Sequence, residues 1–316
     1  MKTWIIGAGA IAIEYAKILT ELGHELTIIG RGEESAQKFF EETGIKAISG
    51  GVENYCASTN QIPDAAIIAV SVDQLFEATV EVIKKGCKKI LVEKPGAVSF
   101  SQIEQLEKIS KENGAKVFIA YNRRFYPSVR KTIKLIEEDG GLKSFHFEFT
   151  EWAFKIEPLP IPDPVKKNWF FANSTHVVDL AFYVGGNPID FCTYTQGGLN
   201  WHSPSSFVGA GFTEKKALFT YKANWDAPGR WGVEFLTSKR KIILQPLEGI
   251  KILKLGTVSI EDFDFVMNPI ELRYKPGFYE QVIDFFSNSP KAKTLTEQKN
   301  NIQNIYSKII SGKFLE

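Results

Sequence analysis

The first 120 residues alternate short apolar runs with segments of helical periodicity, and this alternation restricts the possible folds strongly. Consecutive parallel strands need a crossover connection, which is usually a helix. We therefore predict an α/β fold that begins with a doubly wound parallel sheet covered by helices on both faces. The expected strands are residues 3–6, 25–29, 45–48, 65–70, 89–92 and 116–120, and the expected helices are 11–22, 35–42, 74–85 and 99–113.

The pattern changes after residue 121. The stretch SFHFEFTEW, residues 144–152, alternates with period two, as a half-buried antiparallel strand does. A long proline-rich loop is expected at 154–169. We predict two domains, 1–121 and 122–316, the second being α+β with a broad, mainly antiparallel sheet. Its further expected helices are 127–138, 175–184, 277–286 and 296–310, and its further strands are 189–195, 207–212, 217–223, 233–237 and 241–244.

Composition excludes several classes of function. The formal net charge of +1 gives no sign of a nucleic-acid partner, and no apolar run reaches the ~18–20 residues of a membrane span. The three cysteines are far apart and odd in number, which is typical of reduced thiols. No HExxH, GxSxG or Walker motif occurs, and no metal site is expected. The N-terminus lacks the pattern of a signal peptide, so we expect a cytoplasmic protein.

A glycine loop stands between the first expected strand and the first expected helix. Gly7, Gly9 and Ala12 form the GxGxxA variant of the dinucleotide-binding pattern. Gly7 permits a tight turn, Gly9 lets the backbone approach a pyrophosphate, and Ala12 allows close packing of helix on strand. Phosphates would meet the free N–H groups of the helix start, at Ala10 and Ile11. These features predict a Rossmann domain that binds NAD or NADP.

The end of the second strand bears on the choice between NAD and NADP. NAD sites usually carry an acid there for the ribose 2′-hydroxyl, whereas this chain has Gly30 and Arg31. A guanidinium binds a 2′-phosphate through charge-assisted bonds. The pattern favours NADP over NAD. The alternative is that Arg31 is a solvated loop residue and that Glu33 or Glu34 binds the ribose.

The fifth strand ends in Glu93-Lys94-Pro95. Ligands of doubly wound sheets bind at the carboxyl ends of the strands, where Ser71 also follows the fourth strand. Lys94 should project toward the nicotinamide end of the cofactor and give or take a proton as hydride moves. Pro95 fixes the backbone of this loop, and Glu93 would bind the cofactor or balance the lysine charge.

Four segments in this order make the chain resemble the Gfo/Idh/MocA oxidoreductases, the glucose–fructose oxidoreductase and inositol dehydrogenase group. They are residues 7–12, ILVEKPGAVS at 90–99, YNRRFYP at 121–127 and STHVVDLAFYVGG at 174–186. The resemblance covers nearly the whole chain. It implies NAD(P)-dependent chemistry on sugars, inositols or their derivatives, with Lys94 at the active site, often followed by a cis peptide. It also implies that the second domain has an open sheet that often joins subunits, so we expect a homo-oligomer.

The resemblance implies further site residues. Asn122 and Arg123 fall where such enzymes contact cofactor or substrate, and His176 falls at the histidine that faces the nicotinamide. We therefore expect Lys94 and His176 to be catalytic, Asn122 to bind cofactor, and Arg123 and Asn173 to bind substrate. Many members have an acid four residues before this histidine, where this chain has Ala172.

Several interpretations stay open around these residues. Asp179, three residues after His176, would either orient the imidazole or be a solvated or capping acid, and the second is favoured. The loop at 154–169 would either wall a pocket for an anionic sugar with Lys155, Lys166 and Lys167 or lie at the surface. Arg230, between two tryptophans, would mark a stacking site or, preferably, an interface cluster.

The leading hypothesis is an NADP-dependent oxidoreductase that interconverts a hydroxyl and a carbonyl on a carbohydrate-like small molecule. A second hypothesis is a glycosidase that keeps NAD bound and uses transient oxidation. A third is a non-catalytic NADP-binding sensor, which the absence of an acid at Ala172 would permit.

Overall fold

The computed structural model describes residues 1–315, and their contacts define two compact units. Unit 1 comprises Met1–Tyr121 and Pro269–Asn300, and unit 2 comprises Asn122–Asn268 and the chain from Asn301 onward. The first boundary coincides with the position expected from the sequence. The segment 269–300, which the sequence pattern assigned to the second domain, packs with the first instead.

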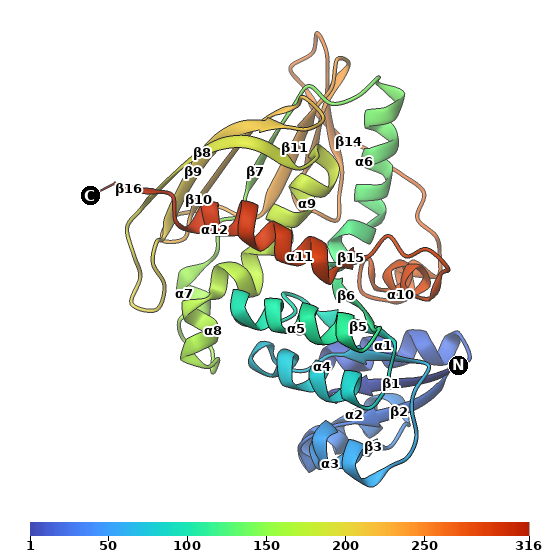
Figure 1. Ribbon diagram of the computed structural model, residues 1–316. Coiled ribbons are helices and arrows are strands. Elements are labelled where there is room, and N and C mark those ends of the chain that lie inside the picture. Colours follow the sequence, from blue (N-terminus) through green and yellow to red (C-terminus); the bar gives the residue numbers. More distant parts are fainter. Residues whose placement is uncertain (316) are drawn as a thin grey trace. The chain divides into compact units, whose positions relative to one another are not determined.

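Unit 1 is built on a seven-stranded sheet with the order β15-β6-β5-β4-β1-β2-β3 (Figure 1). Neighbouring strands from β1 to β6 are parallel, and the order runs outward in both directions from β1 and β4, as in a doubly wound fold. The predicted Rossmann architecture is therefore confirmed. The strands are β1 Lys2–Ile6, β2 Glu25–Ile29, β3 Ala47–Ile48, β4 Ala65–Ile68, β5 Lys89–Glu93, β6 Lys116–Ala120 and β15 Lys293–Thr294.

The helices of unit 1 follow from apolar spacing. In α1, Ala10–Glu21, the buried Ala12, Tyr15, Ala16 and Leu19 recur every three or four residues and form one apolar face. The side chain of Ser99 accepts a bond from Gln102 N and caps α5, as its position before the helix predicts. The other helices of residues 1–121 are α2 Glu33–Thr43, α3 Gly51–Ser58, η1 Val72–Gln74, α4 Leu75–Lys84 and α5 Phe100–Glu112.

Helix α3 was missed because the sequence carries no periodic signal for it. None of its residues is buried, so no apolar stripe marks it. It starts at Gly50-Gly51, where both residues have a positive φ, a pattern more typical of a turn.

The segment 269–300 returns to unit 1 through α10, Phe278–Phe286, then β15 and α11, Leu295–Asn301. Helix α10 packs on α1, with the Phe278 ring 5.1 Å from the Tyr15 ring. Strand β15 pairs antiparallel with β6 and so extends the parallel sheet at its edge. Periodicity reveals the apolar face of such a helix but not the partner that covers it, which explains the misplaced boundary.

Unit 2 is built on a nine-stranded sheet with the order β14-β13-β12-β11-β7-β10-β9-β8-β16. Its pairs are antiparallel except β7 with β10 and β8 with β16, as the mainly antiparallel prediction requires. The strands are β7 Ser144–Glu148, β8 Pro188–Gln196, β9 Ser206–Thr213, β10 Leu218–Asn224, β11 Gly232–Leu236, β12 Arg240–Leu244, β13 Lys251–Lys254, β14 Ile260–Asp262 and β16 Lys313–Leu315; β13, β14 and β16 were not expected.

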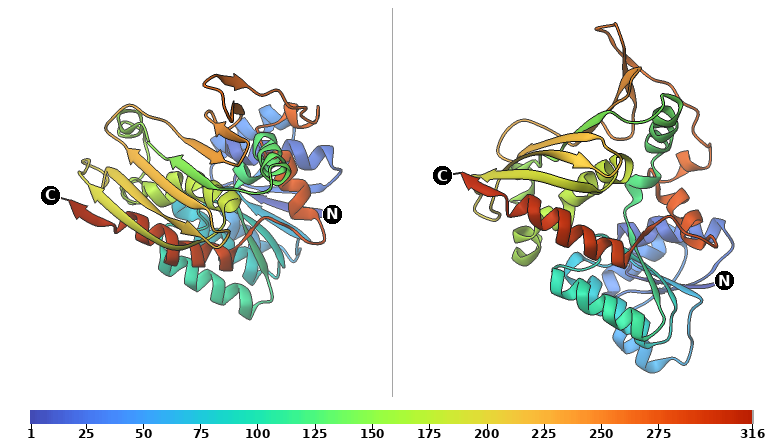
Figure 2. Two further views of the ribbon diagram at one scale, coloured as in Figure 1. Left: turned by 90° about the horizontal axis from the view of Figure 1, so that it is seen from above. Right: turned by 45° about the horizontal axis from the view of Figure 1, so that its top comes forward.

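One face of the nine-stranded sheet is covered by helices, as the views in Figure 2 show for α9. Helix α9, Thr175–Gly185, packs on β7 and β11, and α12, Ser307–Ile310, packs on β8 and β9. Residues of β10 alternate strictly between buried and exposed, so the opposite face is open. Exposed apolar side chains on these strands include Ile189, Val208, Phe212 and Leu218.

The segment expected as a loop at 154–169 is partly helical. It holds α7, Ala153–Ile156, and α8, Asp163–Lys167, followed by a π-helical turn η3, Phe170–Ser174. Prolines mask the signal for α8, although proline is well tolerated in the first turn of a helix. The remaining elements are η2 Asn122–Phe125, α6 Pro127–Glu138, η4 Glu271–Arg273 and η5 Ile302–Tyr306.

None of the helices within residues 1–315 combines the length and apolar composition that crossing a membrane requires.

Candidate active site

The glycine loop has the conformation that the sequence predicted. Gly7 has φ +121°, and its N–H donates to the Ile29 carbonyl at 2.8 Å. A Cβ at Gly7 would lie 2.3 Å from the Ala69 carbonyl oxygen, so only glycine fits at this turn. Gly9 precedes α1, and a Cβ there would meet no protein atom within 4 Å. Its backbone therefore faces open space, which matches a position reserved for close approach by a ligand.

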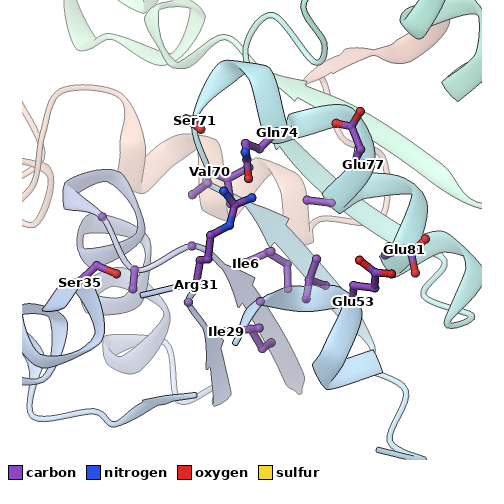
Figure 3. A pocket seen from close by; sticks show the side chains of 18 of the residues that line it. Ile6, Ile29, Arg31, Ser35, Glu53, Val70, Ser71, Gln74, Glu77 and Glu81 are labelled. Atoms are coloured by element: carbon purple, nitrogen blue, oxygen red, sulfur yellow. The ribbon is translucent and has the colours of Figure 1, made fainter. Parts of the chain in front are cut away.

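A cleft of about 680 Å³ opens beside this loop, at the carboxyl ends of β1, β2 and β4 (Figure 3). Of the predicted cofactor residues, Gly7, Gly9, Gly30, Arg31 and Ser71 line it. Ala10 and Ile11 begin α1 but do not line the cleft, and neither do Glu93 and Pro95. The position, size and glycine loop of the cleft fit a dinucleotide.

The cleft is lined by one basic side chain and by several acidic ones. Figure 3 shows Arg31 extending from the end of β2 toward Gln74, with Ser35 on one side and Glu53, Glu77 and Glu81 on the other. The Arg31 and Gly30 carbonyls accept bonds from Gly50 N and Gly51 N at 3.1 and 2.8 Å, which fixes the backbone of this corner. Sequence reasoning missed Ser35 and the three acids because their elements carry no motif.

Glu33 and Glu34, the alternative ligands for the ribose, do not line the cleft as Arg31 does. Ser35 lines the cleft, but its neighbours Glu33 and Glu34 do not, although all three stand in the first turn of α2. The cleft is therefore lined here by the guanidinium of Arg31, after β2, and by the hydroxyl of Ser35, in the first turn of α2.

The Lys94 loop follows β5 directly. The Lys94–Pro95 peptide bond is cis, as the family resemblance implied, and Gly96 N donates to the Glu93 carbonyl at 3.0 Å. The Tyr15 hydroxyl donates to Glu93 Oε1 at 2.8 Å. Burial, together with the Glu93 carboxylate, raises the pKa of Tyr15 well above its usual value, so this hydroxyl keeps its proton.

Within unit 2, Trp231 brings two predicted site residues together. The Arg123 guanidinium lies 4.9 Å from the centroid of the Trp231 ring, and the His176 ring centroid lies 6.1 Å from it. Asn122, next to Arg123 in η2, accepts a bond from Arg123 Nη1 at 3.3 Å. His176 stands in the first turn of α9 and is buried.

Asn173 is held by a buried acid that sequence reasoning missed. Its Nδ2 donates to Glu151 Oε1 and Oε2 at 3.1 and 3.2 Å, and Ser174 Oγ donates to Glu151 Oε1 at 2.7 Å. Glu151 is only 2% exposed. It comes from the segment after β7, far from Ala172 in sequence, so a search for an acid near His176 could not find it.

Asp179 is neither solvated nor a helix cap, which corrects part of the favoured interpretation. It is 1% exposed and accepts two bonds from Arg124, from Nε at 2.7 Å and from Nη2 at 2.8 Å. The Arg124 guanidinium also lies 4.6 Å from the Tyr183 ring. This bidentate buried pair fixes η2, which carries Asn122 and Arg123, to α9, which carries His176.

Arg230 lies over two tryptophan rings, at 4.6 Å from that of Trp152 and 5.5 Å from that of Trp231. Among the loop lysines, Lys166 donates to the Glu157 carbonyl at 2.7 Å and Lys155 lies 5.7 Å from the Phe154 ring. No group of His, Cys, Asp and Glu within residues 1–315 could hold a metal ion. The cysteines Cys56, Cys87 and Cys192 are free thiols.

Comparison with known proteins assigns a family to residues 1–121. Residues 1–121 match the model of Gfo/Idh/MocA, the oxidoreductase family with an NAD-binding Rossmann fold. Residues 1–121 are a Gfo/Idh/MocA domain. A search of the curated proteins found no match.

Solved structures with the same fold span almost the whole chain. UDP-N-acetylglucosamine 3-dehydrogenase GnnA from Acidithiobacillus ferrooxidans has a TM-score of 0.72 at 14% identity, over 97% of this chain and 96% of that one. WlbA dehydrogenase from Bordetella pertussis, in complex with NADH and UDP-GlcNAcA, has 0.73 at 18%, over 98% and 97%. A super-repressor mutant of Gal80p from Saccharomyces cerevisiae has 0.78 at 12%, over 99% and 96%. At these identities the likeness shows the fold of the Gfo/Idh/MocA domain and of unit 2.

Proposed function

We propose that this protein is an NAD(P)-dependent oxidoreductase that interconverts a hydroxyl and a carbonyl on a sugar, a polyol or a sugar derivative. The observation that carries the proposal is the glycine-lined cleft of the Gfo/Idh/MocA domain together with Lys94 at the end of β5 in the same sheet. The family supplies the reaction class. The dehydrogenases among the structures of like fold support a carbohydrate substrate.

The nicotinamide, when bound, supplies or accepts the hydride. We assign proton transfer to Lys94, whose ammonium donates a proton to the carbonyl oxygen during reduction and whose neutral amine accepts the proton of the hydroxyl during oxidation. His176 is proposed as the second catalytic group. Arg123 and Asn173 are proposed to bind substrate hydroxyls or acidic groups, Arg123 as a donor held against Trp231 and Asn173 through the amide oxygen that its bonds to Glu151 leave available.

Gly7, Gly9 and the first N–H groups of α1, at Ala10 and Ile11, are proposed to bind the pyrophosphate. We also propose that the cofactor contacts Ser71, Glu93, Pro95 and Asn122.

We further propose a preference for NADP. Arg31 and Ser35 line the cleft at the end of β2, where a 2′-phosphate would be placed, and Glu33 and Glu34 do not. The acids Glu53, Glu77 and Glu81 lie across the cleft from Ser35. A guanidinium recognises a phosphate through charge-assisted hydrogen bonds, and NADH lacks that group.

The substrate class can be narrowed by charge. GnnA is a UDP-N-acetylglucosamine dehydrogenase and WlbA holds UDP-GlcNAcA, so we propose that an anionic, nucleotide-linked sugar belongs to the first compounds to test. Arg123, Arg230 and the lysines of 155–167 supply positive charge in unit 2. The exposed apolar residues of β8–β10 support a homo-oligomer formed through the open sheet.

A non-catalytic sensor is the second candidate, because a super-repressor mutant of Gal80p shares the fold. An NAD-retaining glycosidase is the third. Titration with NADPH and NADH, followed by nicotinamide fluorescence, and a screen of UDP-N-acetylglucosamine, free sugars and inositols for NADP reduction separate the three. Turnover with NADP supports the proposal. Tightly held NAD supports the glycosidase, and binding of NADPH with no turnover on any compound supports the sensor.

A further inference from the structure

The segment 269–300 that returns to unit 1 buries two glutamines, Gln281 on α10 and Gln298 on α11, whose role goes beyond filling space. Both are 0% exposed. Burying an amide without hydrogen bonds costs about 1–3 kcal/mol, whereas an apolar side chain of similar size would fill the same space without that cost. The groups that these amides contact therefore indicate what they do.

Gln298 ties together the ends of two neighbouring strands. Its Nε2 donates to the Pro95 carbonyl at 2.9 Å and to the Tyr121 hydroxyl at 3.2 Å. Pro95 follows β5 and Tyr121 follows β6, and these strands pair in parallel. The same returning segment adds Lys293, whose ammonium lies 4.8 Å from the centroid of the Tyr121 ring. The residue after Lys94 is thus held by a side chain about 200 residues further along the chain.

Gln281 acts on the residue before Lys94 through Tyr15. The fully buried Tyr15 hydroxyl lies 2.8 Å from Glu93 Oε1 and 3.0 Å from Gln281 Oε1, and its single proton lies between these two acceptors. The raised pKa of Tyr15 keeps this donor protonated. Phe278, also on α10, packs its ring 5.1 Å from the Tyr15 ring. Helix α10 therefore fixes Tyr15, and Tyr15 fixes the Glu93 carboxylate.

Each glutamine also retains one buried polar atom, Gln281 Nε2 and Gln298 Oε1, that has no hydrogen-bond partner within residues 1–315. A buried polar atom without a partner costs stability, so an apolar side chain would fill either position at lower cost. Packing alone gives no reason to place amides at both positions.

We propose that Tyr15, Gln281 and Gln298 are positioning residues for Lys94, so that the returning segment sets the conformation of the Glu93-Lys94-Pro95 loop from both sides. The inference rests on the proposed function only for the proton-transfer role of Lys94. The structural part concerns unit 1 alone. Two charged side chains belong to these contacts: Glu93, which accepts the bond from Tyr15, and Lys293, which lies over the Tyr121 ring.

Hydrogen exchange tests the contact of Gln298 directly. In Gln298→Met the side-chain length is kept and the donor is lost. We expect the amides of Lys94, Gly96 and Ala97 to exchange about 10-fold faster, since one buried hydrogen bond is worth about 1.4 kcal/mol at most. The amides of β2 serve as an internal reference, and Asn300→Met, an exposed change on the same segment, is the control. Unchanged exchange of the Lys94 loop, or an equal increase in β2, would overturn the proposal.

Acetylation of Lys94, followed by mass spectrometry across pH, tests the path through Tyr15. In Tyr15→Phe the Glu93 carboxylate loses its hydrogen bond from the Tyr15 hydroxyl, so its negative charge acts more strongly on Lys94. This favours the ammonium form, and the pH midpoint of Lys94 acetylation should therefore rise by about half a pH unit. In Glu93→Gln the midpoint should fall, and adding Tyr15→Phe to it should have no further effect. Tyr279→Phe, which changes a half-buried tyrosine of α10 that stacks on Tyr274, is the control and should leave the profile unchanged.

A general loss of packing would not produce this dependence on Glu93. Additive effects of Tyr15→Phe and Glu93→Gln, or no shift in either, would contradict the proposed path. Neither measurement needs turnover, so they stand apart from the catalytic assignment. If the loop responds as expected but Lys94→Ala keeps full turnover, the positioning is upheld and the proposed role of Lys94 fails.

Discussion

The two units hold their proposed functional residues by different means. In unit 1 the cofactor cleft is shaped by the main chain, through a turn at Gly7 where only glycine fits and through carbonyl and N–H groups at strand ends. In unit 2 Arg123, Asn173 and His176 depend on buried side chains, namely the Arg124–Asp179 pair, Glu151 and Trp231. A site formed by the main chain therefore depends on a short local motif, whereas a site formed by side chains depends on residues that are far apart in the sequence.

The largest expected effect is on the buried ion pair of unit 2. Replacing Asp179 with Ala leaves the Arg124 charge buried, which should lower the free energy of unfolding by about 3–5 kcal/mol. Five of the six tryptophans lie in unit 2, so urea unfolding followed by tryptophan fluorescence reports mainly on this unit. Glu261→Ala, which breaks the exposed pair with Lys254 within unit 2, is the control and should change little. If Asp179→Ala were as stable as the wild type, the claim that buried side chains hold the proposed functional residues of unit 2 would be contradicted.

The glycine loop gives the matching test for unit 1. Gly7→Ala places a Cβ 2.3 Å from the Ala69 carbonyl oxygen at a positive φ, so it should reduce NADPH binding at least ~100-fold, or about 2.7 kcal/mol, and lower stability. Gly9→Ala meets no protein atom and should keep the stability of the wild type while weakening binding. Fluorescence titration and thermal unfolding measure both quantities. Normal NADPH binding by Gly9→Ala would mean that no ligand approaches this residue.

Arg31 tests the proposed cofactor preference. Arg31→Ala should reduce the preference for NADPH over NADH by about 10-fold, or about 1.4 kcal/mol, with NADH binding almost unchanged. Parallel titrations of the two nucleotides give the ratio. The double variant Glu33→Gln/Glu34→Gln is the informative control, because weaker binding of NADH there would favour the alternative ribose ligands.

Glu151 has the smallest expected effect. A glutamine at this position keeps one acceptor oxygen and replaces the other with a donor that faces Asn173 and Ser174, at a cost of about 1 kcal/mol in unfolding. If Asn173 binds substrate, Glu151→Gln should also raise KM for whichever screened sugar is turned over, with kcat less affected. Glu157→Gln, which changes an exposed acid just after α7, is the control. A lower kcat at constant KM would assign Glu151 a role in chemistry rather than in binding.

The same contrast between local and distant contacts decides which features could be predicted from the sequence. The order of strands and helices up to residue 121, the turn at Gly7 and the lysine at the end of β5 follow from local patterns, because each depends on neighbouring residues. The return of 269–300 to unit 1, the partner of Asp179 and the acid beside Asn173 depend on residues separated by 22 or more positions. Periodicity cannot show such contacts, since it reports that a face is buried without reporting against what.

The proposed role of Lys94 is tested by comparing Lys94→Ala with the wild type in two assays, NADPH binding and NADP-dependent turnover of the sugar with the highest activity in the screen. We expect NADPH to bind within about twofold of wild type, because the glycine loop and Arg31 are intact, while kcat falls by about 10²–10⁴-fold, as for loss of a general acid–base. Unchanged turnover by Lys94→Ala would contradict the central claim that this lysine moves the proton.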